Sequence, residues 1–535
     1  MRTKLLLAAL PLAALPLAAL SLAAALFAFA ASPLFAFAAS QWVYFGHDHK
    51  LHYRTDERGN RIMDFSCAGY RAGGVRLPDA PAVKTLAPLE GDNTPQIQAA
   101  IDEVSTRTPD ANGLRGAVAL KTGVYRVDGT VTIAASGVVL RGSGSGDSGT
   151  VIHLASEAHR FLEMRGTGVL RTVGNSAAIT DAYVPCGANS FHVDDASAFH
   201  VGDAVVVERP VTEAWIHFMG MDTLVRDGKA QTWIKAGSSI HTDRTIQAIS
   251  GKLITLDVPL TDSFDAKLLK APGTAQEAAQ GASMVRYEFP GRISQVGVEN
   301  LRVAAPFTDV PITSPDFSVL RMDAVVDAWV KDVAVQETQN GIVIGPGAKR
   351  VTFERVRVVH SAAHSGAAAP ADFSIAGTQI LLDRCSVDGE GTWPVVTQAS
   401  VTGPDVVLNF SGSAHAGVSP HQRWATGLLV DGARLPGTVA RTPGIAFSNR
   451  KTAGSGHGWD IGWAVAWNVV SPHLLVQQPP GAMNWCIGCS GERTKAADIP
   501  EGIYDSPGRA VEPVSLYLEQ LRERLGDAAL VNIGY

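Results

Sequence analysis

Histidine and arginine side chains gather in one part of this sequence, between residues 419 and 458. His421 and Arg423 stand two positions apart in the segment SPHQRWATG. In an extended segment such residues share a face, so we expect these two side chains to point the same way. An imidazole beside a guanidinium suits proton abstraction next to a bound carboxylate. His457 and Arg450 form a second group of this kind, in the glycine-rich segment SNRKTAGSGHGW.

Aromatic and polar side chains surround these four candidate catalytic residues. Half of the 10 Trp residues lie between positions 424 and 485, and the face of an indole can stack on a sugar ring. We therefore expect a cleft that binds sugars. The candidate binding residues are Asn449, Lys451, Asn484, Trp424, Trp459, Trp485 and His364. Trp463 and Trp467 alternate along a strand-like run, which predicts instead that they fill the interior.

The 5 cysteines do not predict a metal site. Cys486 and Cys489 form a C-x-x-C pair, but no second pair exists to complete a zinc site. This pair is either a local disulfide or two unpaired thiols, and Cys67 and Cys186 are a further candidate pair. We expect no metal and no cofactor at the candidate site.

Short Val- and Ile-rich segments separated by glycine turns predict a mostly β structure. Four similar apolar strings, read from Leu301, Val333, Val356 and Cys385, follow one another at steps of 32, 23 and 29 residues. Such steps are typical of the coils of a parallel β-helix, in which loop insertions add length. We expect these four residues to face inward, with Cys385 as a buried thiol.

Two helices are predicted, one on each side of the strand-rich region. Asp92 or Thr94 can cap a helix whose apolar residues between 97 and 104 recur at helical spacing. Leucines between 516 and 525 recur in a similar way, and Gly526 marks the end of that segment. We expect this second helix to pack on the coils or to cover their C-terminal end.

Composition excludes several classes of protein. The 535 residues are 46% hydrophobic and 18% charged, with a net charge of -6, which excludes a disordered chain. The cysteines are too few to hold together a chain of this length. The acidic balance disfavours nucleic acid as a partner.

Residues 1–39 are expected to be a signal peptide. They begin with Arg2 and Lys4, continue as a long Ala- and Leu-rich run, and contain A-x-A motifs. Prolines within the run disfavour the alternative, an uncleaved membrane anchor. We therefore expect a secreted or periplasmic protein with no membrane contact after cleavage.

Three strings between residues 64 and 155, GDNTPQIQAAID, GAVALKTGVYRV and GVVLRGSG, resemble the N-terminal cap and first coils of the pectate-lyase superfamily. The fold class that this resemblance implies is all-β: a right-handed parallel β-helix with an N-terminal capping helix, a small β-insertion and a C-terminal helix. The expected divisions are the signal peptide (1–39), an N-terminal segment (40–63), the cap and first coils (64–189), the insertion (190–262), the main β-helix with the active-site face (263–495) and a C-terminal tail with its helix (496–535).

The resemblance also implies an activity, because many exported members of this superfamily are polysaccharide lyases. Such enzymes cleave uronic-acid-containing polysaccharides by β-elimination: a base removes the C5 proton while positive charge neutralises the neighbouring carboxylate. On this hypothesis His421 or His457 is the base, and Arg423 or Arg450 is the neutralising group. Asn484 is a supporting donor, and the indoles are sugar platforms. The expected partner is an acidic polysaccharide, and the oligomeric state stays open.

Departures from the family pattern keep other functions open. Residues 360–490 contain no cluster of Asp residues, so a calcium cofactor is not supported. The Gly-His-Gly at 456–458 matches β-helix hydrolases of the polygalacturonase type, but no outward pair of carboxylates, which hydrolysis needs, is evident near it. The alternatives are a glycoside hydrolase of that type and a non-catalytic carbohydrate-binding or adhesion β-helix.

Overall fold

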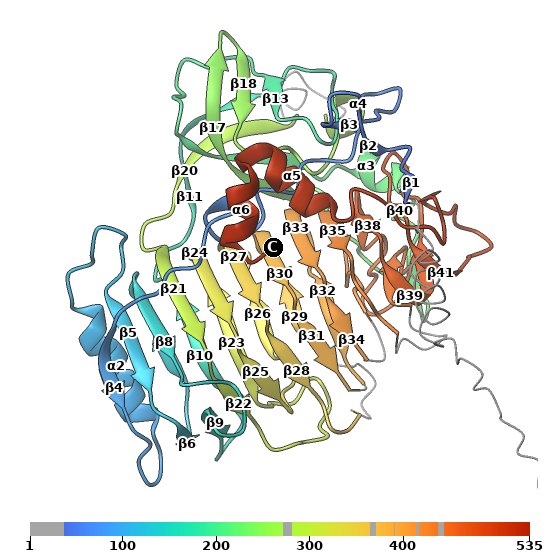
Figure 1. Cartoon of the computed structure of the whole chain (residues 1–535). Helices are drawn as coiled ribbons and strands as arrows, with labels where there is room; N and C mark the ends of the chain where they lie inside the picture. The colour runs from blue at the N-terminus through green and yellow to red at the C-terminus, as the bar shows by residue number, and fades with distance from the viewer. Residues whose placement is uncertain (1–36, 271–280, 364–370, 390, 414–416, 437–442) are drawn as a thin grey trace, which may run out of the picture. The chain divides into compact units, whose positions relative to one another are not determined.

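Three parallel sheets wind through most of the chain, coil after coil (Figure 1). The protein has the expected fold class, an all-β right-handed parallel β-helix with an N-terminal capping helix, a β-insertion and C-terminal helices. The computed structural model describes residues 37–270, 281–363, 371–389, 391–413, 417–436 and 443–535.

The first sheet has 13 strands and forms one side of the β-helix. Val298 pairs with Val330, Val330 with Phe353, and Phe353 with Leu382, so one inward column continues from coil to coil. The strands are β4 (Ala82–Leu86), β5 (Gly116–Leu120), β8 (Val138–Arg141), β21 (Ile293–Glu299), β24 (Val325–Lys331), β27 (Ala348–Glu354), β30 (Thr378–Asp383), β33 (Thr402–Leu408), β35 (Ala425–Asp431), β37 (Ile461–Gly462), β38 (Val465–Trp467), β40 (Trp485–Ile487) and β42 (Ile503–Asp505).

Two further sheets complete the coils. The second sheet contains β7 (Val131–Ile133), β10 (Arg160–Arg165), β23 (Ser318–Asp323), β26 (Ile342–Ile344), β29 (Ala371–Ile375) and β32 (Trp393–Thr397). The third contains β6 (Gly123–Val127), β9 (Thr150–Leu154), β22 (Arg302–Ala304), β25 (Ala334–Gln336), β28 (Arg357–Val359), β31 (Ser386–Asp388) and β34 (Ser411–Gly412). Bridges at Val418 and Arg434 join these sheets to the last coils, β36 (Ile445–Phe447), β39 (Val470–Val476) and β41 (Ser490–Arg493).

The recurring strings of the sequence are the corners between the first and third sheets. Leu301, Val333, Val356 and Cys385 are buried in one core, as predicted, and Cys385 is a free thiol. Each follows a residue in the left-handed region, with φ between 52° and 54°. That backbone conformation turns the chain sharply, so the next strand begins in a new direction.

The N-terminal helix α2 (Thr94–Ser105) covers the first coils with the apolar face that its spacing predicts. Its buried residues are Ile97, Ala100, Ile101 and Val104, and Pro95 fits the first turn, where no backbone donor is needed. The helix follows Asn93, and the Asp92 carboxylate accepts hydrogen bonds from Thr94.

The β-insertion is longer than the predicted 190–262. Its antiparallel sheet begins at Arg171 and ends at Glu288, and the β-helix resumes at β21. Both ends of the insertion therefore lie in residue ranges that the sequence predicts to be coils. Its elements are β11 (Arg171–Ala178), β12 (Tyr183–Val184), β13 (Ser190–His192), β14 (Ala204–Pro210), α3 (Glu213–Phe218), β15 (Val225–Arg226), β16 (Lys229–Ala230), β17 (Ser239–Ser250), β18 (Leu253–Leu256), β19 (Phe264–Asp265), α4 (Ala266–Leu269) and β20 (Ser283–Glu288).

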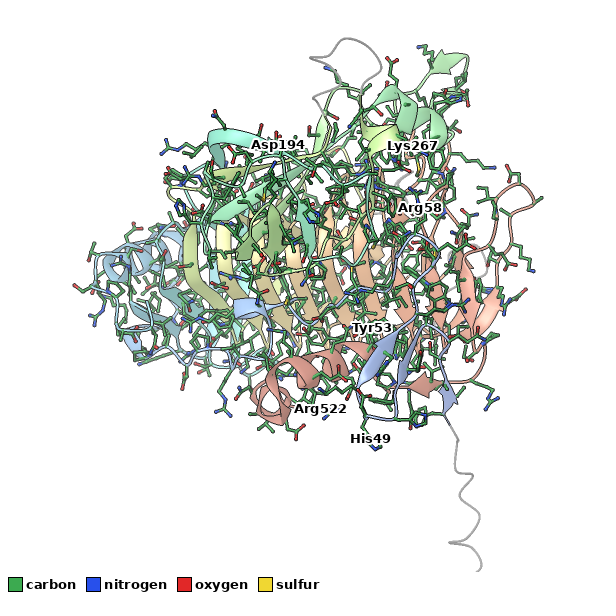
Figure 2. The ribbon with its side chains drawn as sticks, turned by 90° about the horizontal axis from the view of Figure 1, so that it is seen from above. His49, Tyr53, Arg58, Asp194, Lys267 and Arg522 are labelled. Carbon is green, nitrogen blue, oxygen red and sulfur yellow. A yellow bond between two sulfur atoms is a disulfide. The ribbon has the colours of Figure 1, made fainter. Side chains whose placement is uncertain are left out.

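The terminal segments pack on the outer face of the first sheet. Helices α5 (Leu516–Leu525) and α6 (Asp527–Asn532) meet at Gly526, as predicted, and α5 packs on the coils rather than over their end. Figure 2 shows α5, which carries Arg522, beside the strand of Tyr53, and Gln520 donates to the Tyr53 hydroxyl over 3.0 Å. The remaining elements are β1 (Ala38–Ala39), β2 (Val43–Phe45), β3 (Leu51–Tyr53), the 3-10 turn η1 (Tyr70–Ala72) and β43 (Val511–Glu512). Because β42 still belongs to the first sheet, the coils extend past the predicted limit of 495.

Cys486 and Cys489 are joined by a disulfide, one of the two alternatives left open by the sequence. Cys67 and Cys186, the other candidate pair, are both free thiols, and both are buried. Within the described part of the chain, the helices are too short or too polar to cross a membrane. The expected signal peptide lies almost entirely outside the described residues.

Candidate functional site

A cavity of about 1280 Å³, which we call the histidine cavity, lies on the outer face of the second sheet and its continuation. Its floor is one column of outward side chains. Strand register aligns Val343, Ser374 and Val396. The bridges of Val418 to Val395 and to Ile445 place Ser419, the residue after Val418, in the same column. From coil to coil, the column reads Val343, Ser374, Val396, Ser419, Ala446 and Leu475.

The two candidate histidines meet at one end of this floor. Their rings are perpendicular, with centroids 4.6 Å apart. The backbone N–H of His421 donates to Thr397 O over 3.0 Å, which fixes His421 on the coil ladder. His457 belongs to a hairpin loop closed by an antiparallel bridge between Asn449 and Trp459. Both rings line the histidine cavity.

The surroundings keep both imidazoles neutral. Burial lowers the pKa of His421 to about 4, and the charges of Arg450 and Arg423 act in the same direction. Burial also lowers the pKa of His457 to about 4, again with the two arginines and with His421 contributing. At neutral pH each ring therefore has an unprotonated nitrogen that can accept a proton.

Arg450 is hydrogen-bonded to the backbone beside both histidines. Its Nη1 donates to the carbonyl of His421 over 2.6 Å, and its own N–H donates to Gly458 O over 2.7 Å. The guanidinium also lies 6.0 Å from the centre of the Trp393 ring, which lines the cavity and is half-buried. Arg450 thus brings positive charge and an aromatic wall next to the histidines.

One carboxyl group, that of Asp460, is among the described residues that line this cavity. It accepts hydrogen bonds from the backbone N–H and the hydroxyl of Ser448, over 2.8 and 2.9 Å. Burial raises the pKa of this carboxyl well above its ordinary value, and the hydrogen bonds from Ser448 act in the opposite direction.

A second buried acid, Asp372, lies next to a residue of the cavity lining. Asp372 accepts from Thr392 over 2.8 Å and contacts His360 Nε2 at 2.7 Å. Burial works to lower the pKa of His360, but the hydrogen bond and charge of Asp372 raise it above the ordinary value. We interpret this pair as a structural contact between the end of β28 and β29.

Comparisons with known proteins leave the family of this chain open. No protein-family model matches it, and a search of curated proteins finds no match. Among solved structures, it resembles the gp49 tailspike of Pseudomonas phage LKA1 at 13% identity and a TM-score of 0.38, over 74% of this chain and 56% of that one. It also resembles the Gp54 tailspike of Acinetobacter baumannii bacteriophage AP22, solved with a capsular saccharide, at 10% identity and a TM-score of 0.36, over 75% and 51%.

A third similar structure is the A-module of the Azotobacter vinelandii mannuronan C-5 epimerase AlgE6, at 12% identity and a TM-score of 0.34. It covers 79% of this chain and 96% of that one, whereas the chain spans little more than half the length of the two tailspikes. At these values the likeness carries no argument about activity. The fold rests on the strand pairing described above, and membership of the pectate-lyase superfamily is not shown.

Arg423 does not share a face with His421, contrary to the sequence prediction. Its φ is +57° and that of Trp424 is +62°, so the segment turns instead of running extended. The guanidinium leaves the histidine cavity and donates to the hydroxyl of Ser455 over 2.6 Å. The rule that residues two apart point together holds only for extended backbone.

The predicted sugar platforms Trp424, Trp459 and Trp485 are buried, with at most 3% of each residue exposed. Trp424 donates to Asp262 over 2.8 Å, and Trp459 donates to Met219 O over 3.3 Å. These indoles pack between the coils, the insertion and the N-terminal segment, so none offers a free face to a sugar.

Asn484 is also internal rather than a donor to substrate. It is fully buried, accepts from Ala464 N–H and donates to the carbonyls of Ile461 and Gln477, so it ties neighbouring turns together. Asn449 caps the hairpin loop by accepting from Lys451 N–H over 2.8 Å.

Lys451 points away to the surface, where its ammonium pairs with Asp498 at 2.5 Å. His364 lies outside the described residues. Of the predicted residues that the structure describes, His421, His457 and Arg450 are therefore brought together at the histidine cavity.

Sequence reasoning missed Trp393 and the floor column. Trp393 stands at the start of β32, in the segment TWPVVT, and its pairing with Ala371 shows which coil it belongs to. The repeating strand pattern could have identified them, if it had been followed into the later coils, where the loops between strands are longest. The described residues hold no group of three or more His, Cys, Asp or Glu side chains that could bind a metal ion.

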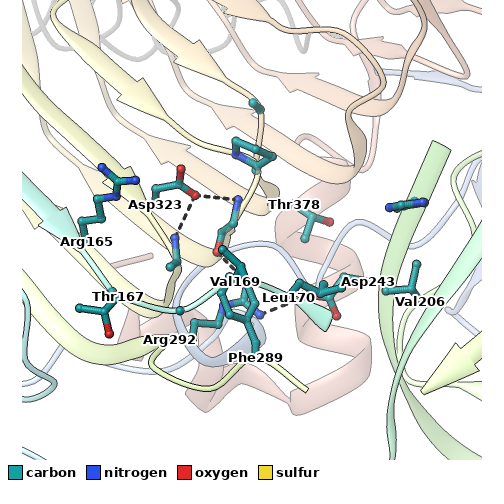
Figure 3. A pocket seen from close by; sticks show the side chains of 18 of the residues that line it. Arg165, Thr167, Val169, Leu170, Val206, Asp243, Phe289, Arg292, Asp323 and Thr378 are labelled. Carbon is teal, nitrogen blue, oxygen red and sulfur yellow. Dashed lines mark hydrogen bonds and ion pairs between the residues drawn. The ribbon is translucent and has the colours of Figure 1, made fainter. Parts of the chain in front are cut away.

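A separate cavity of about 1000 Å³ lies between the insertion and the corners of the coils (Figure 3). Its acid Asp243 accepts from Lys349 and Tyr287, both over 2.7 Å, and pairs with Arg292 at 3.3 Å. Burial would raise the pKa of Asp243, but the charges of Lys349 and Arg292 lower it. These charges satisfy one another, so we interpret this insertion cavity as the seam that attaches the insertion.

Proposed function

We propose that this protein is a secreted polysaccharide lyase that cleaves a uronic-acid-containing polysaccharide by β-elimination in the histidine cavity. The observation that supports this proposal is that two neutral imidazoles lie beside Arg450 at one end of the floor of the histidine cavity. This arrangement supplies an imidazole as base and a guanidinium that can bind the substrate carboxylate, and it does not need a pair of acidic side chains.

His421 is the proposed base. The Nε2 of His457 lies close against Gly454, since a Cβ on that glycine would come 2.1 Å from it. His421 is the less buried of the two rings, and its edge-to-face contact holds it against His457. His457 is therefore a positioning residue, and His421 takes the C5 proton.

Arg450 is the proposed partner of the substrate carboxylate. Removal of the C5 proton places negative charge on that carboxylate, and a guanidinium beside it stabilises the charge. His421 takes the C5 proton, the electron pair forms a C4–C5 double bond, and the bond from C4 to the glycosidic oxygen breaks. The leaving oxygen then takes up a proton from water. The bound carboxylate also raises the basicity of His421, because an opposite charge favours the imidazolium.

The hydrolase alternative is less well supported. Inverting and retaining glycosidases use two carboxyl groups flanking the bond. Asp460 is the one acidic side chain among the described residues that line the cavity. Its carboxyl group already accepts hydrogen bonds from Ser448. The non-catalytic alternative relied on a face of exposed Trp residues, and those residues are buried.

A panel of polyuronates and glycosaminoglycans tests the proposal. Ultraviolet absorbance of the unsaturated sugar should rise with at least one polymer, and His421→Ala should lower the rate by about 10²–10⁴-fold, the usual worth of a general base. His47→Ala, an exposed histidine far along the chain from this site, is the matched control and should leave the rate unchanged. Full activity in the His421→Ala protein would contradict the assignment.

Calcium and other cofactors are not part of the proposal. Addition of a chelator should therefore leave the rate within about twofold of the untreated enzyme. The proposed partner remains an acidic polysaccharide, outside the cell or in the periplasm.

A further inference from the structure

A smaller cavity of about 740 Å³ adjoins the histidine cavity, and we call it the cationic cavity. Arg226 and Gly454 line both cavities, so the two share a wall. The cationic cavity also contains Arg423, which turns away from His421. A chain bound at the histidines can therefore continue over Gly454 into this second space.

The β-insertion builds one side of the cationic cavity. The short hairpin of β15 and β16 lies against the loop that carries His457. Arg226 Nη1 donates to Gly454 O over 2.8 Å, and Gln231 Nε2 donates to the same carbonyl over 3.3 Å. These two hydrogen bonds hold the hairpin beside the loop that carries His457.

The charge of this cavity is opposite to that of the whole protein. Its lining carries four basic side chains, Arg226, Lys229, Lys235 and Arg423, and one acidic side chain, Asp227, among the described residues. The whole chain has a net charge of -6. Lys229 and Lys235 are exposed, so a bound anion can reach their ammonium groups. A local positive cavity on an acidic protein selects anionic ligands.

We propose that the cationic cavity binds carboxylates of the same polysaccharide chain, on sugar units beyond the bond that is cleaved. The proposal rests on the proposed function for its class of polymer. The insertion is then part of the substrate site, and Arg423 binds a distant carboxylate instead of the one beside the C5 proton. Contacts to such units that are equally strong in the ground state and the transition state tighten the binding of long chains without raising kcat.

Direct binding tests this inference without relying on catalysis. Two charge-matched double variants are prepared in a His421→Ala background: Lys229→Ala with Lys235→Ala, and Lys252→Ala with Lys267→Ala. The second pair is exposed on the same insertion but lines neither cavity. Titration calorimetry with sodium alginate and with polygalacturonate measures each Kd at low and high salt.

We expect the first double variant to bind about 10-fold more weakly than the second at low salt, with the gap closing at high salt because ions screen exposed charges. Equal affinities of the two variants at low salt would overturn the inference, and so would failure of the parent protein to bind either polymer. If the parent binds but the wild-type protein cleaves neither polymer, the proposed lyase function fails while the binding inference stands.

Discussion

His421 is an imidazole whose basicity depends on what binds beside it. In the free protein, burial and two arginines lower its pKa to about 4. In the proposed complex, a substrate carboxylate at Arg450 offsets the positive charge and raises that pKa. The same residue is thus neutral and ready before binding, and a stronger base afterwards.

The pH dependence of the rate follows from this difference. The proposed mechanism requires unprotonated His421, so it predicts that kcat/KM, which reports the free enzyme, falls only below about pH 4. The acid limb of kcat should lie at higher pH, because the bound carboxylate raises the pKa of the complex. Initial rates across pH 3–8 measure both limbs. A kcat/KM limb near the ordinary histidine pKa would show that the histidines are not desolvated.

Trp393 is predicted to contact the sugar chain. Trp393→Ala should raise KM by about 10-fold with little change in kcat, since stacking on a sugar ring is a binding interaction. Trp485→Phe, at a buried indole, serves as the comparison and should affect stability more than KM. An unchanged KM in the Trp393 variant would remove this residue from the site.

At the residue scale, His421, His457 and Arg450 line one cavity, whereas the indoles predicted to bind sugar are buried. Clustering along the chain could show that Trp424, Trp459 and Trp485 lie near one another. It could not show on which side of each strand they lie, because that depends on register and on the two left-handed residues at Arg423 and Trp424.

The hairpin loop from Asn449 to Trp459 is the element that places His457. Gly454 has φ +58°, and a Cβ there would lie 2.1 Å from His457 Nε2. A Cβ at this position would therefore have to displace the imidazole, and the positive φ also favours glycine.

Gly454→Ala should therefore displace His457 and disturb His421 through their ring contact. We expect kcat to fall by about 10-fold or more, with the fold retained, because the loop lies at the surface. Gly220→Ala is the matched control: it also has positive φ, at +67°, but a Cβ there would meet no atom within 4 Å. Equal activity of the two variants would mean that the loop does not position the histidine.

The C-terminal helix α5 docks on a buried acid. Asp431 Oδ2 accepts from Ser515 Oγ over 2.7 Å and from Tyr517 N–H over 2.8 Å. Burial raises the pKa of Asp431 to about 7, so this acid is mostly protonated in the folded protein below neutral pH.

Stability should consequently decrease as pH rises. The folded state binds a proton at Asp431 that the unfolded state releases near pH 4, so the free energy of unfolding falls between about pH 4 and 7. Asp431→Asn keeps an acceptor oxygen and removes the titration, so it should lessen the loss of denaturation midpoint between pH 5 and 8. Asp102→Asn, on the exposed face of α2, should not. An equal pH slope in both variants would contradict this account.

The whole molecule combines a long core with a site assembled from distant segments. Lys229 on the insertion and His457 on the last coils are more than two hundred positions apart in the chain. Strand pairing and the contacts of Arg226 to Gly454 bring their loops together. Sequence periodicity predicted the coils and a small β-insertion, but nothing in the residues of the insertion indicates which loop it contacts.

The limits of the insertion show the same effect. The sequence suggested 190–262, whereas β11 and β20 pair with each other across more than a hundred residues of chain. Such pairing is nonlocal, and the sequence of β11 does not show whether its partner is parallel or antiparallel.

The most direct test of the central claim is a count of chain ends after digestion of a polyuronate. β-Elimination produces one unsaturated non-reducing end for every new reducing end, which proton NMR and a reducing-sugar assay measure separately. The account predicts equal numbers of the two ends with the wild-type protein. New reducing ends without unsaturated ends would establish hydrolysis and contradict the account.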